Sequence, residues 1–146
     1  MLPEFISFAF SIANVHHGFA EVAGLARASK YGLILEFETK YLGLLRLGVK
    51  EVGISISEIE SVNLKEGWLR TEIVVKARSL RTLTEIPGSH QGQIKLRIPR
   101  KEKEVAKHAA SMLMLHISEK EINKLKQEAD QFANDNLSEA KTKQLP

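Results

Sequence analysis

Cysteine is absent from the 146-residue chain, which excludes disulfide bonds, thiolate metal ligands and cysteine nucleophiles. Aspartate is absent before Asp130, so acid–base chemistry in the earlier part of the chain would need glutamate or histidine. No run of about 18 apolar residues occurs, and we therefore expect no transmembrane helix. The apolar start of the chain lacks a basic segment and a cleavage site, so we expect mature structure there rather than a signal peptide.

A strong charge of either sign is also lacking. The net charge is +3 and the isoelectric point is about 9.2, a mild excess that draws phosphate only weakly from a distance. The basic groups of the chain are not interleaved with aromatic side chains, on which single-stranded nucleic acid would stack. We therefore expect no nucleic-acid partner. The length and the 43% hydrophobic content suit one globular domain with a real core.

Several segments before Pro99 alternate apolar and polar residues. A period of two is typical of β-strands that bury one face and expose the other. The predicted strands cover residues 4–13, 20–28, 33–39, 51–57, 61–65, 69–78 and 93–98. The first of them is either an opening strand or an arm that adds to a sheet. The three segments between residues 49 and 78 are joined by short turns, which predicts an antiparallel meander.

Details of this region predict where the sheet bends and where strands begin. At Glu58-Ile59 the apolar spacing changes from two to three residues, which predicts a bulge or half-turn that lets the sheet curl. Trp68 follows a Glu-Gly turn and is expected to pack at the start of the longest strand. Residues 79–86 fit both a short helix and an edge strand, and both alternatives stay open.

The segment Lys40–Gly48 (KYLGLLRLG) interrupts the alternation. Five of its nine residues are tyrosine or leucine and two are glycine, which predicts a bent connection. One interpretation is a lid folded over one end of the core. The other is an exposed apolar loop that contacts a partner or a membrane surface.

After Pro99 the apolar spacing becomes that of an α-helix. It predicts an amphipathic helix over residues 100–117. Ser118 and Glu121 form a capping-box pattern, which predicts a second helix or a restart. Apolar residues continue at spacings of three and four, a narrow seam like that of a coiled coil, in Ile122, Leu125, Ala129 and Phe132. From Asn134 onward the composition is polar and predicts a frayed tail.

The order of these elements predicts a mainly β fold with a C-terminal α-helix. The stretch Gly48–Trp68 (GVKEVGISISEIESVNLKEGW) places an Ile-rich strand before a Ser-Glu-Ile bend, followed by a strand, a glycine turn and an aromatic residue. This arrangement resembles bacterial pleckstrin-homology-like and GRAM-like domains over residues 20–117. The resemblance implies a curled antiparallel barrel of six to seven strands, with a long C-terminal helix that plugs one open end. Residues 1–19 would then be an N-terminal strand or arm, and residues 118–146 a helical extension with a frayed tail.

The resemblance also implies a function in interaction or assembly. Lipid-binding members of this group use basic residues in the loop after the first strand, in a pattern close to Lys-x(n)-Lys/Arg-x-Arg. This chain offers Arg27 and Lys30 there, with no Lys/Arg-x-Arg after them. Bacterial relatives include oligomerising and protein-binding modules, so binding to a protein partner or self-association is the leading hypothesis.

No arrangement of catalytic or metal-binding residues emerges from the sequence. His16 and His17 are adjacent, and neighbouring strand positions point to opposite faces, which makes a poor chelate. The Ser-His pair of residues 88–92 lacks the order of a nucleophile elbow. The glutamates of residues 33–39 are neighbours on one strand, whereas glycosidase carboxylates face each other across a cleft. We expect no enzyme activity, no metal and no cofactor.

The hypotheses assign residues to different surfaces. The predicted partner surface consists of Tyr41, Leu42, Leu44, Leu45, Ile122, Leu125 and Phe132. An alternative function is binding to an anionic lipid headgroup or membrane surface through Arg27, Lys30, Arg78 and Arg81. A second alternative is a small-ligand carrier or enzyme that uses the mouth of the barrel. We expect a cytoplasmic protein, peripheral to the membrane if the lipid hypothesis holds.

Overall fold

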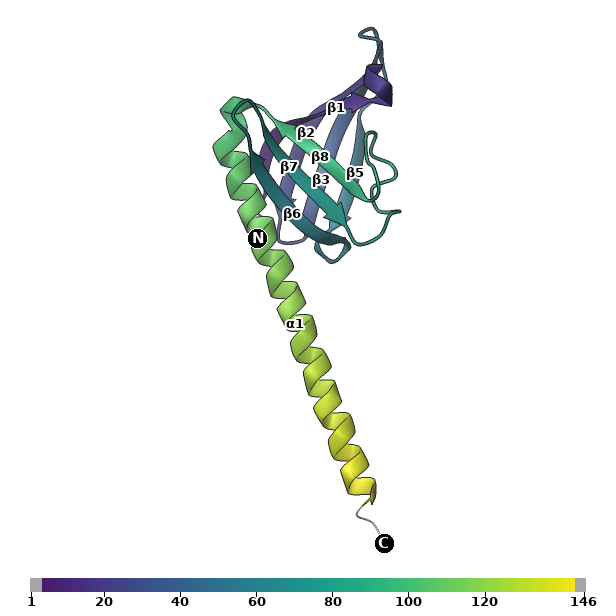
Figure 1. Cartoon of the computed structure of the whole chain (residues 1–146), viewed down its shortest axis with the longest axis vertical. Helices are drawn as coiled ribbons and strands as arrows, with labels where there is room; N and C mark the ends of the chain where they lie inside the picture. Colours follow the sequence, from purple (N-terminus) through teal and green to yellow (C-terminus); the bar gives the residue numbers. More distant parts are fainter. Residues whose placement is uncertain (1–3, 144–146) are drawn as a thin grey trace.

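The chain forms a curled antiparallel sheet followed by a long helix (Figure 1). The computed structural model describes residues 4–143, except the side chains of Asn14 and of residues 140–143. The strands in this part of the chain are β1 (Ile6–Val15), β2 (Ala20–Ser29), β3 (Gly32–Tyr41), β4 (Leu45–Arg46), β5 (Lys50–Ser55), β6 (Ile59–Glu66), β7 (Thr71–Ala77) and β8 (Gln93–Ile98). Three 3-10 turns and one helix complete it: η1 (His16–Gly18), η2 (Ile56–Glu58), η3 (Arg100–Glu102) and α1 (Lys103–Lys143).

The strands pair in the order β4-β3-β2-β1-β8-β7-β6, and β5 pairs with β3. The sheet curls without closing, because β5 and β6 do not pair with each other within the described residues. One residue pair, Ser11 with Arg97, joins β1 to β8. Because β1 lies inside the sheet, it is a strand of the domain and not a free arm. The predicted class, a curled antiparallel sheet followed by a C-terminal helix, is confirmed, with eight strands and no closed barrel.

Two glycines allow neighbouring strands to approach closely. Gly24 lies in the middle of β2, and a Cβ atom there would collide with the backbone oxygen of Glu36 on β3. Gly32 begins β3 with a φ of 142°, a backbone conformation that favours glycine. A Cβ atom at Gly32 would collide with the backbone oxygen of Ile54 on β5. Only glycine fits these two positions without separating the strands.

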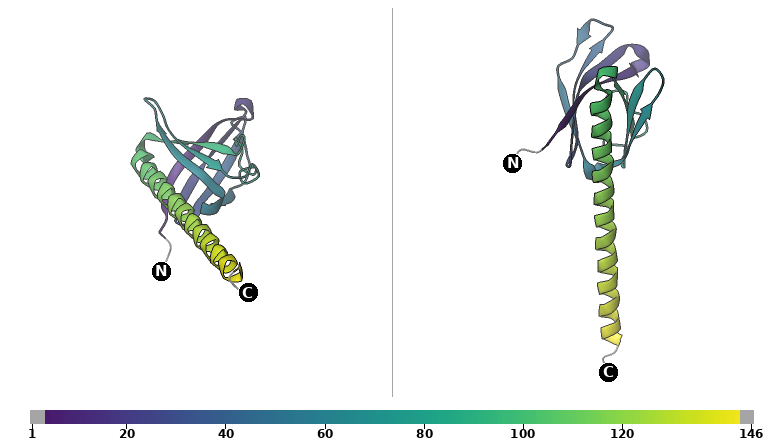
Figure 2. Two further views of the ribbon diagram at one scale, coloured as in Figure 1. Left: turned by 60° about the horizontal axis from the view of Figure 1, so that its bottom comes forward. Right: turned by 90° about the vertical axis from the view of Figure 1, so that its left-hand side faces the viewer.

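The core lies between the concave face of the sheet and the first part of α1. Fully buried side chains from the strands include Phe8, Leu33, Leu35, Ile54, Ile59, Ile73, Ile94 and Leu96. Helix α1 packs against β1, β2 and β6 and contributes Ala106, Ala109, Ala110, Leu113 and Ile117 to the same core. The small alanine side chains let the helix lie close to the strands. Figure 2 shows α1 running along the sheet before it leaves the domain.

Ion pairs connect the start of α1 to the end of β6. A carboxylate oxygen of Glu66 lies 3.6 Å from Nζ of Lys103, and the other lies 3.3 Å from Nζ of Lys107. The hydrogen bond from Lys107 and the positive charges of both lysines hold the pKa of the Glu66 carboxyl below its ordinary value. Because these groups are exposed, the contacts orient the helix more than they stabilise it.

The predicted meander over residues 49–78 is wrong in its pairing. β5 pairs with β3, whereas β6 pairs with β7. The predicted half-turn is present as η2, and it takes the chain from one end of the sheet to the other. Two backbone hydrogen bonds hold this corner: Ile56 donates to Tyr31, and Arg78 donates to Glu58. Alternation within a strand identifies its buried face but not its neighbour.

Trp68 does not pack at the start of a strand. Its side chain is 93% exposed in the turn between β6 and β7, and β7 begins only at Thr71. The N–H of Gly67 donates to the carbonyl of Arg70, which closes a turn that carries Trp68 and Leu69 outward. With seven residues, β7 is also shorter than β1, β2 and β3, which have ten each.

Two segments with open alternatives are now settled. Residues 79–86 form successive turns, neither strand nor helix, and bury Leu83 and Ile86 in the core. Residues 40–48 do not form a lid over the core. Strand β3 continues to Tyr41 and β4 returns beside it, so the segment is an exposed apolar loop at the tip of a hairpin.

Helix α1 has no break at Ser118. The predicted second helix or restart at this residue is wrong, because α1 continues to Lys143 through the region that the composition predicts to fray. Residues 100–143 contain neither proline nor glycine. The backbone hydrogen bonds of the helix therefore continue without interruption.

Candidate interaction surface along helix α1

The surroundings of α1 change at Ile117. Up to this residue, one face of the helix is buried against the sheet. Every residue from 118 to 139 is exposed, and Figure 1 shows this part of the helix extending away from the domain. More than half of the 41-residue helix, whose full length is roughly 60 Å, therefore buries no described side chain against the sheet, although the stretch from Lys120 to Gln127 still borders a hollow that it shares with η2.

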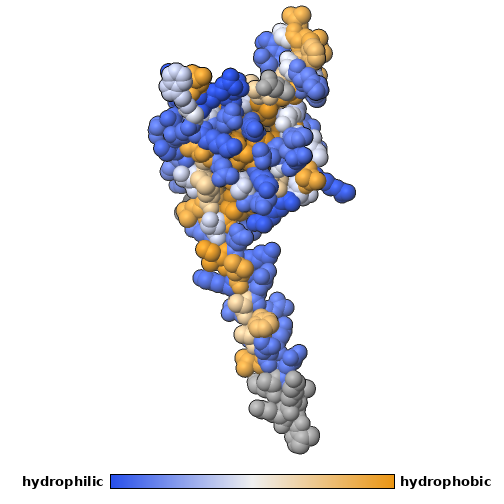
Figure 3. All heavy atoms as spheres, in the orientation of Figure 1, coloured by the Kyte–Doolittle hydropathy of each residue, from blue (hydrophilic) through white to orange (hydrophobic). Residues whose placement is uncertain are grey.

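Apolar side chains follow one side of this projecting helix. Ile122, Leu125 and Phe132 are 51%, 59% and 69% exposed, and Figure 3 shows apolar side chains among polar ones along the extension. Spacings of three and four keep such residues on one side of a helix. The same spacing extends in both directions, and we call the full set the α1 seam: Leu115, Ser118, Ile122, Leu125, Ala129, Phe132 and Asn136. Sequence reasoning missed Leu115 and Asn136, because it treated Ser118 as the start of a new helix.

The α1 seam faces away from the domain. Leu113 points into the core, and Ile122 follows nine residues later. At about 100° per residue, Ile122 therefore lies on the opposite side of the helix. Leu115 is already exposed beside the domain. A second helix can lie along the whole seam without displacing the sheet.

The two sides of the α1 seam carry different charges. One flank is acidic, with Glu121, Glu128 and Asp135 at intervals of seven residues. The other flank is mixed and consists of Glu119, Lys126 and Ala133. Glu119 also lies 3.4 Å from Nδ1 of His116 on the same helix. Because the two flanks differ in charge, a parallel and an antiparallel partner helix would meet different charges along the seam.

The loop between β3 and β4 exposes a second apolar group. Leu42, Leu44 and Leu45 are exposed, Leu44 to 89%. Tyr41 is partly covered, and its ring stacks on the imidazole of His16 with centroids 5.7 Å apart. Figure 3 shows this apolar group at the opposite end of the molecule from the projecting helix. The seven residues of the predicted partner surface therefore fall on two separate surfaces.

The structure gives the four predicted headgroup-binding residues different surroundings. The Arg27 guanidinium lies 3.8 Å from Glu36 and 3.3 Å from Glu51, so its charge is already compensated. Lys30 lies over the ring of its neighbour Tyr31, and Arg81 is exposed in the turns after β7. Of the four, Arg78 alone lines the hollow of about 450 Å³ between η2 and α1.

The histidines do not converge on a site. His16 and His17 both have left-handed backbone angles, with φ of 50° and 59°. His16 contacts Tyr41, whereas His116 contacts Glu119 on α1. Among residues 4–143, no three histidine or carboxylate side chains lie in an arrangement that could hold a metal ion.

No protein-family model, curated protein or solved structure matches this chain. The resemblance to pleckstrin-homology-like domains therefore stays a prediction. Within the described part of the chain, α1 is long enough to cross a membrane but far too polar, and no other helix has the length.

Proposed function

We propose that the chain is a non-catalytic, pleckstrin-homology-like assembly module that pairs with a second copy of itself along the α1 seam. The observation that carries the proposal is the exposed seam on the projecting helix. Most helices in proteins gain their stability by packing an apolar face, whereas Ile122, Leu125 and Phe132 of the α1 seam are exposed. A second helix that covers the seam supplies this packing.

The seam residues suit a two-stranded pair. In parallel dimers, a β-branched residue at the first core position and leucine at the second favour two strands, and a single core asparagine fixes the register. Ile122, Leu125 and Asn136 occupy these positions in the α1 seam. Three exposed apolar side chains on each copy would leave water on pairing: Ile122, Leu125 and Phe132.

The flanking charges favour a parallel pair over an antiparallel one. In a parallel pair, Glu121 of each copy faces Lys126 of the other, which gives two attractive contacts. In an antiparallel pair, the acidic flank of one copy faces the acidic flank of the other. That arrangement brings Glu121, Glu128 and Asp135 against like charges. The self-complementary pattern supports a second copy as the partner.

The family resemblance supports self-association, and the composition of the chain supports a cellular compartment. Bacterial pleckstrin-homology-like modules include oligomerising domains, in keeping with self-association here. A chain without cysteine suits the reducing cytoplasm, which we propose as its compartment.

Sedimentation of the full chain tests the proposal. We expect a reversible monomer–dimer equilibrium over roughly 1 µM to several hundred µM, because the seam is only about three heptads long. Leu125→Glu should shift the chain to monomer, since it places two carboxylates face to face in the seam. Asn134→Glu is the matched control: it also adds a carboxylate beside existing acidic residues, but on the side of the helix away from the seam.

Two results would contradict self-association through α1. One is a monomer at every concentration that is unchanged by truncation after Ile117. The other is a dimer that Leu125→Glu and Asn134→Glu weaken equally. Circular dichroism and thermal unfolding of each variant show whether the sheet domain is intact, so a loss of pairing is distinguished from a loss of fold.

A further inference from the structure

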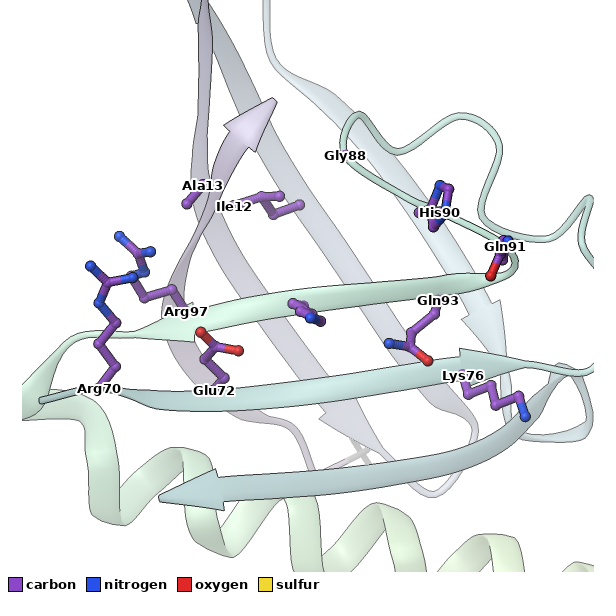
Figure 4. A pocket seen from close by; sticks show the side chains of 11 residues that line it. Ile12, Ala13, Arg70, Glu72, Lys76, Gly88, His90, Gln91, Gln93 and Arg97 are labelled. Atoms are coloured by element: carbon purple, nitrogen blue, oxygen red, sulfur yellow. The ribbon is translucent and has the colours of Figure 1, made fainter. Parts of the chain in front are cut away.

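A polar hollow of about 630 Å³ lies where β1 and β8 diverge (Figure 4). These strands pair at Ser11 and Arg97 and then separate. The backbone of Gly88 in the loop before β8 lies against β1, since a Cβ atom there would be 2.7 Å from Cγ2 of Ile12. The hollow, here called the basic groove, is lined mainly by Arg70, Glu72, Lys76, His90, Gln91, Gln93, Lys95 and Arg97.

The charges that line the basic groove are unbalanced. The lining contains four positively charged side chains and one carboxylate, that of Glu72. Lys76 lies 3.7 Å from Glu60, but Arg70, Lys95 and Arg97 form no ion pair with any described residue. The register of β7 and β8 places Glu72 opposite Arg97 and Val74 opposite Lys95, so these side chains share the outer face of the sheet. Three cations outside any ion pair of the described residues, with one carboxylate among them, leave this concave site with a net positive charge that attracts an anion.

Arg97 has a second feature that calls for an acceptor. Its Nε atom is buried and has no hydrogen-bond partner among the described residues. Buried N–H groups normally have an acceptor, and guanidinium groups bind carboxylate or phosphate through two parallel hydrogen bonds. Figure 4 shows the guanidinium groups of Arg70 and Arg97 at the same end of the groove. Two neighbouring guanidinium groups, neither of them in an ion pair with a described residue although Glu72 lies across from Arg97, suit a doubly charged group such as a phosphate.

We propose that the basic groove binds a phosphorylated polyol, with Arg70 and Arg97 holding the phosphate. At the other end of the groove, Gln91 and Gln93 present amide groups that suit hydroxyls (Figure 4). The volume is in the usual range for small-ligand sites. The described lining of the groove contains no phenylalanine, tyrosine or tryptophan, whose rings are the usual platforms for stacked bases. The same phosphate chemistry is offered by a free sugar or glycerol phosphate and by a lipid headgroup.

Titration of the full chain with glycerol 3-phosphate at low ionic strength tests the site. We expect binding, and a loss of affinity of roughly 10- to 100-fold in Arg97→Gln and in Arg70→Gln. The control is Arg81→Gln, which removes the same charge from an exposed turn outside the groove and should leave the affinity unchanged. The thermal midpoint of each variant shows whether it is folded. Absence of binding by the natural chain, or equal losses in Arg81→Gln and Arg97→Gln, would overturn the proposal.

A second measurement separates the two sources of phosphate. Phosphatidic acid presents a phosphate monoester on a diacylated glycerol, so phosphatidylcholine vesicles with and without phosphatidic acid test whether the groove takes the phosphate of a lipid. Binding to the acidic vesicles that Arg97→Gln abolishes assigns the groove to a lipid headgroup. Binding to glycerol 3-phosphate without vesicle binding assigns it to a soluble ligand. Because the groove is on the outer face of the sheet and α1 covers the concave face, failure here leaves self-association untouched.

Discussion

A cysteine at Ser118 tests both the pairing of α1 and its orientation. Ser118 lies on the α1 seam, and the natural chain has no cysteine that could compete. In a parallel pair in register, residue 118 of one copy faces residue 118 of the other. The variant Ser118→Cys should therefore form a disulfide between copies under mild oxidation.

The distances separate the two orientations clearly. A disulfide joins Cα atoms about 4.4–6.8 Å apart. In an antiparallel pair that overlaps over residues 115–136, residue 118 would lie opposite residue 133. The two copies of residue 118 would then be 15 residues apart along the helix axis, which is roughly 22 Å at 1.5 Å per residue. No side-chain rearrangement spans that distance, so a disulfide at residue 118 requires the parallel arrangement.

The assay is a non-reducing gel after oxidation, at concentrations where sedimentation detects dimer. The control is Asn134→Cys, which lies on the side of α1 away from the seam and should cross-link only by random collision. Rapid cross-linking of Ser118→Cys alone supports parallel pairing. A dimer by sedimentation that never cross-links at residue 118 would refute the orientation while leaving self-association in place. Equal rates for the two cysteines would refute the seam itself.

Three further predictions concern the domain. Leu113→Ala should lower the free energy of unfolding by about 2–5 kcal/mol in chemical denaturation, because Leu113 is fully buried between α1 and the sheet. Gly24→Ala should cost at least about 2 kcal/mol, since the new methyl group meets the Glu36 carbonyl, whereas Gly53→Ala meets nothing within 4 Å and should change stability by less than about 0.5 kcal/mol. Glu66→Gln should be less stable than the natural chain near neutral pH, and the difference should vanish as acid protonates Glu66. The sign follows from the lowered pKa of Glu66, whose stabilising contribution is present above the unfolded-state pKa and is lost as the pH falls through the folded-state pKa.

The strands could be predicted from the sequence because burial in this sheet is one-sided. Ile94, Leu96 and Ile98 face the core while Lys95 is exposed, and this alternation is written directly in the sequence. The half-turn at η2 was also readable, since it changes the spacing of buried residues. What alternation does not encode is the neighbour of each strand. The pairing of β5 with β3 depends on contacts across the fold, so the meander prediction failed.

Burial of Trp68 was predicted from its apolarity, and the structure shows that apolarity alone does not decide burial. The turn that Gly67 and Arg70 close places this side chain outside the sheet whatever its hydrophobicity. The basic groove was missed for another reason. Arg70 is distant in sequence from Lys95 and Arg97, and it comes near them only because β7 pairs with β8. The sequence does show which positions of each strand face outward. These positions reveal the groove only when the pairing of the two strands is known.

Pairing through α1 and binding in the basic groove would act together on a membrane surface. Parallel pairing places both domains at the same end of the coil, and two linked sites can raise avidity by about 10²–10⁴ on a surface that presents many headgroups. If the groove takes a lipid headgroup, Leu125→Glu should therefore weaken binding to phosphatidic acid vesicles while leaving the affinity of each groove for glycerol 3-phosphate unchanged. Vesicle flotation and calorimetric titration of the same protein samples measure the two quantities. An equal loss in both would mean that Leu125→Glu disturbs the domain itself, and an unchanged vesicle affinity would mean that the two grooves of a pair do not act on one surface.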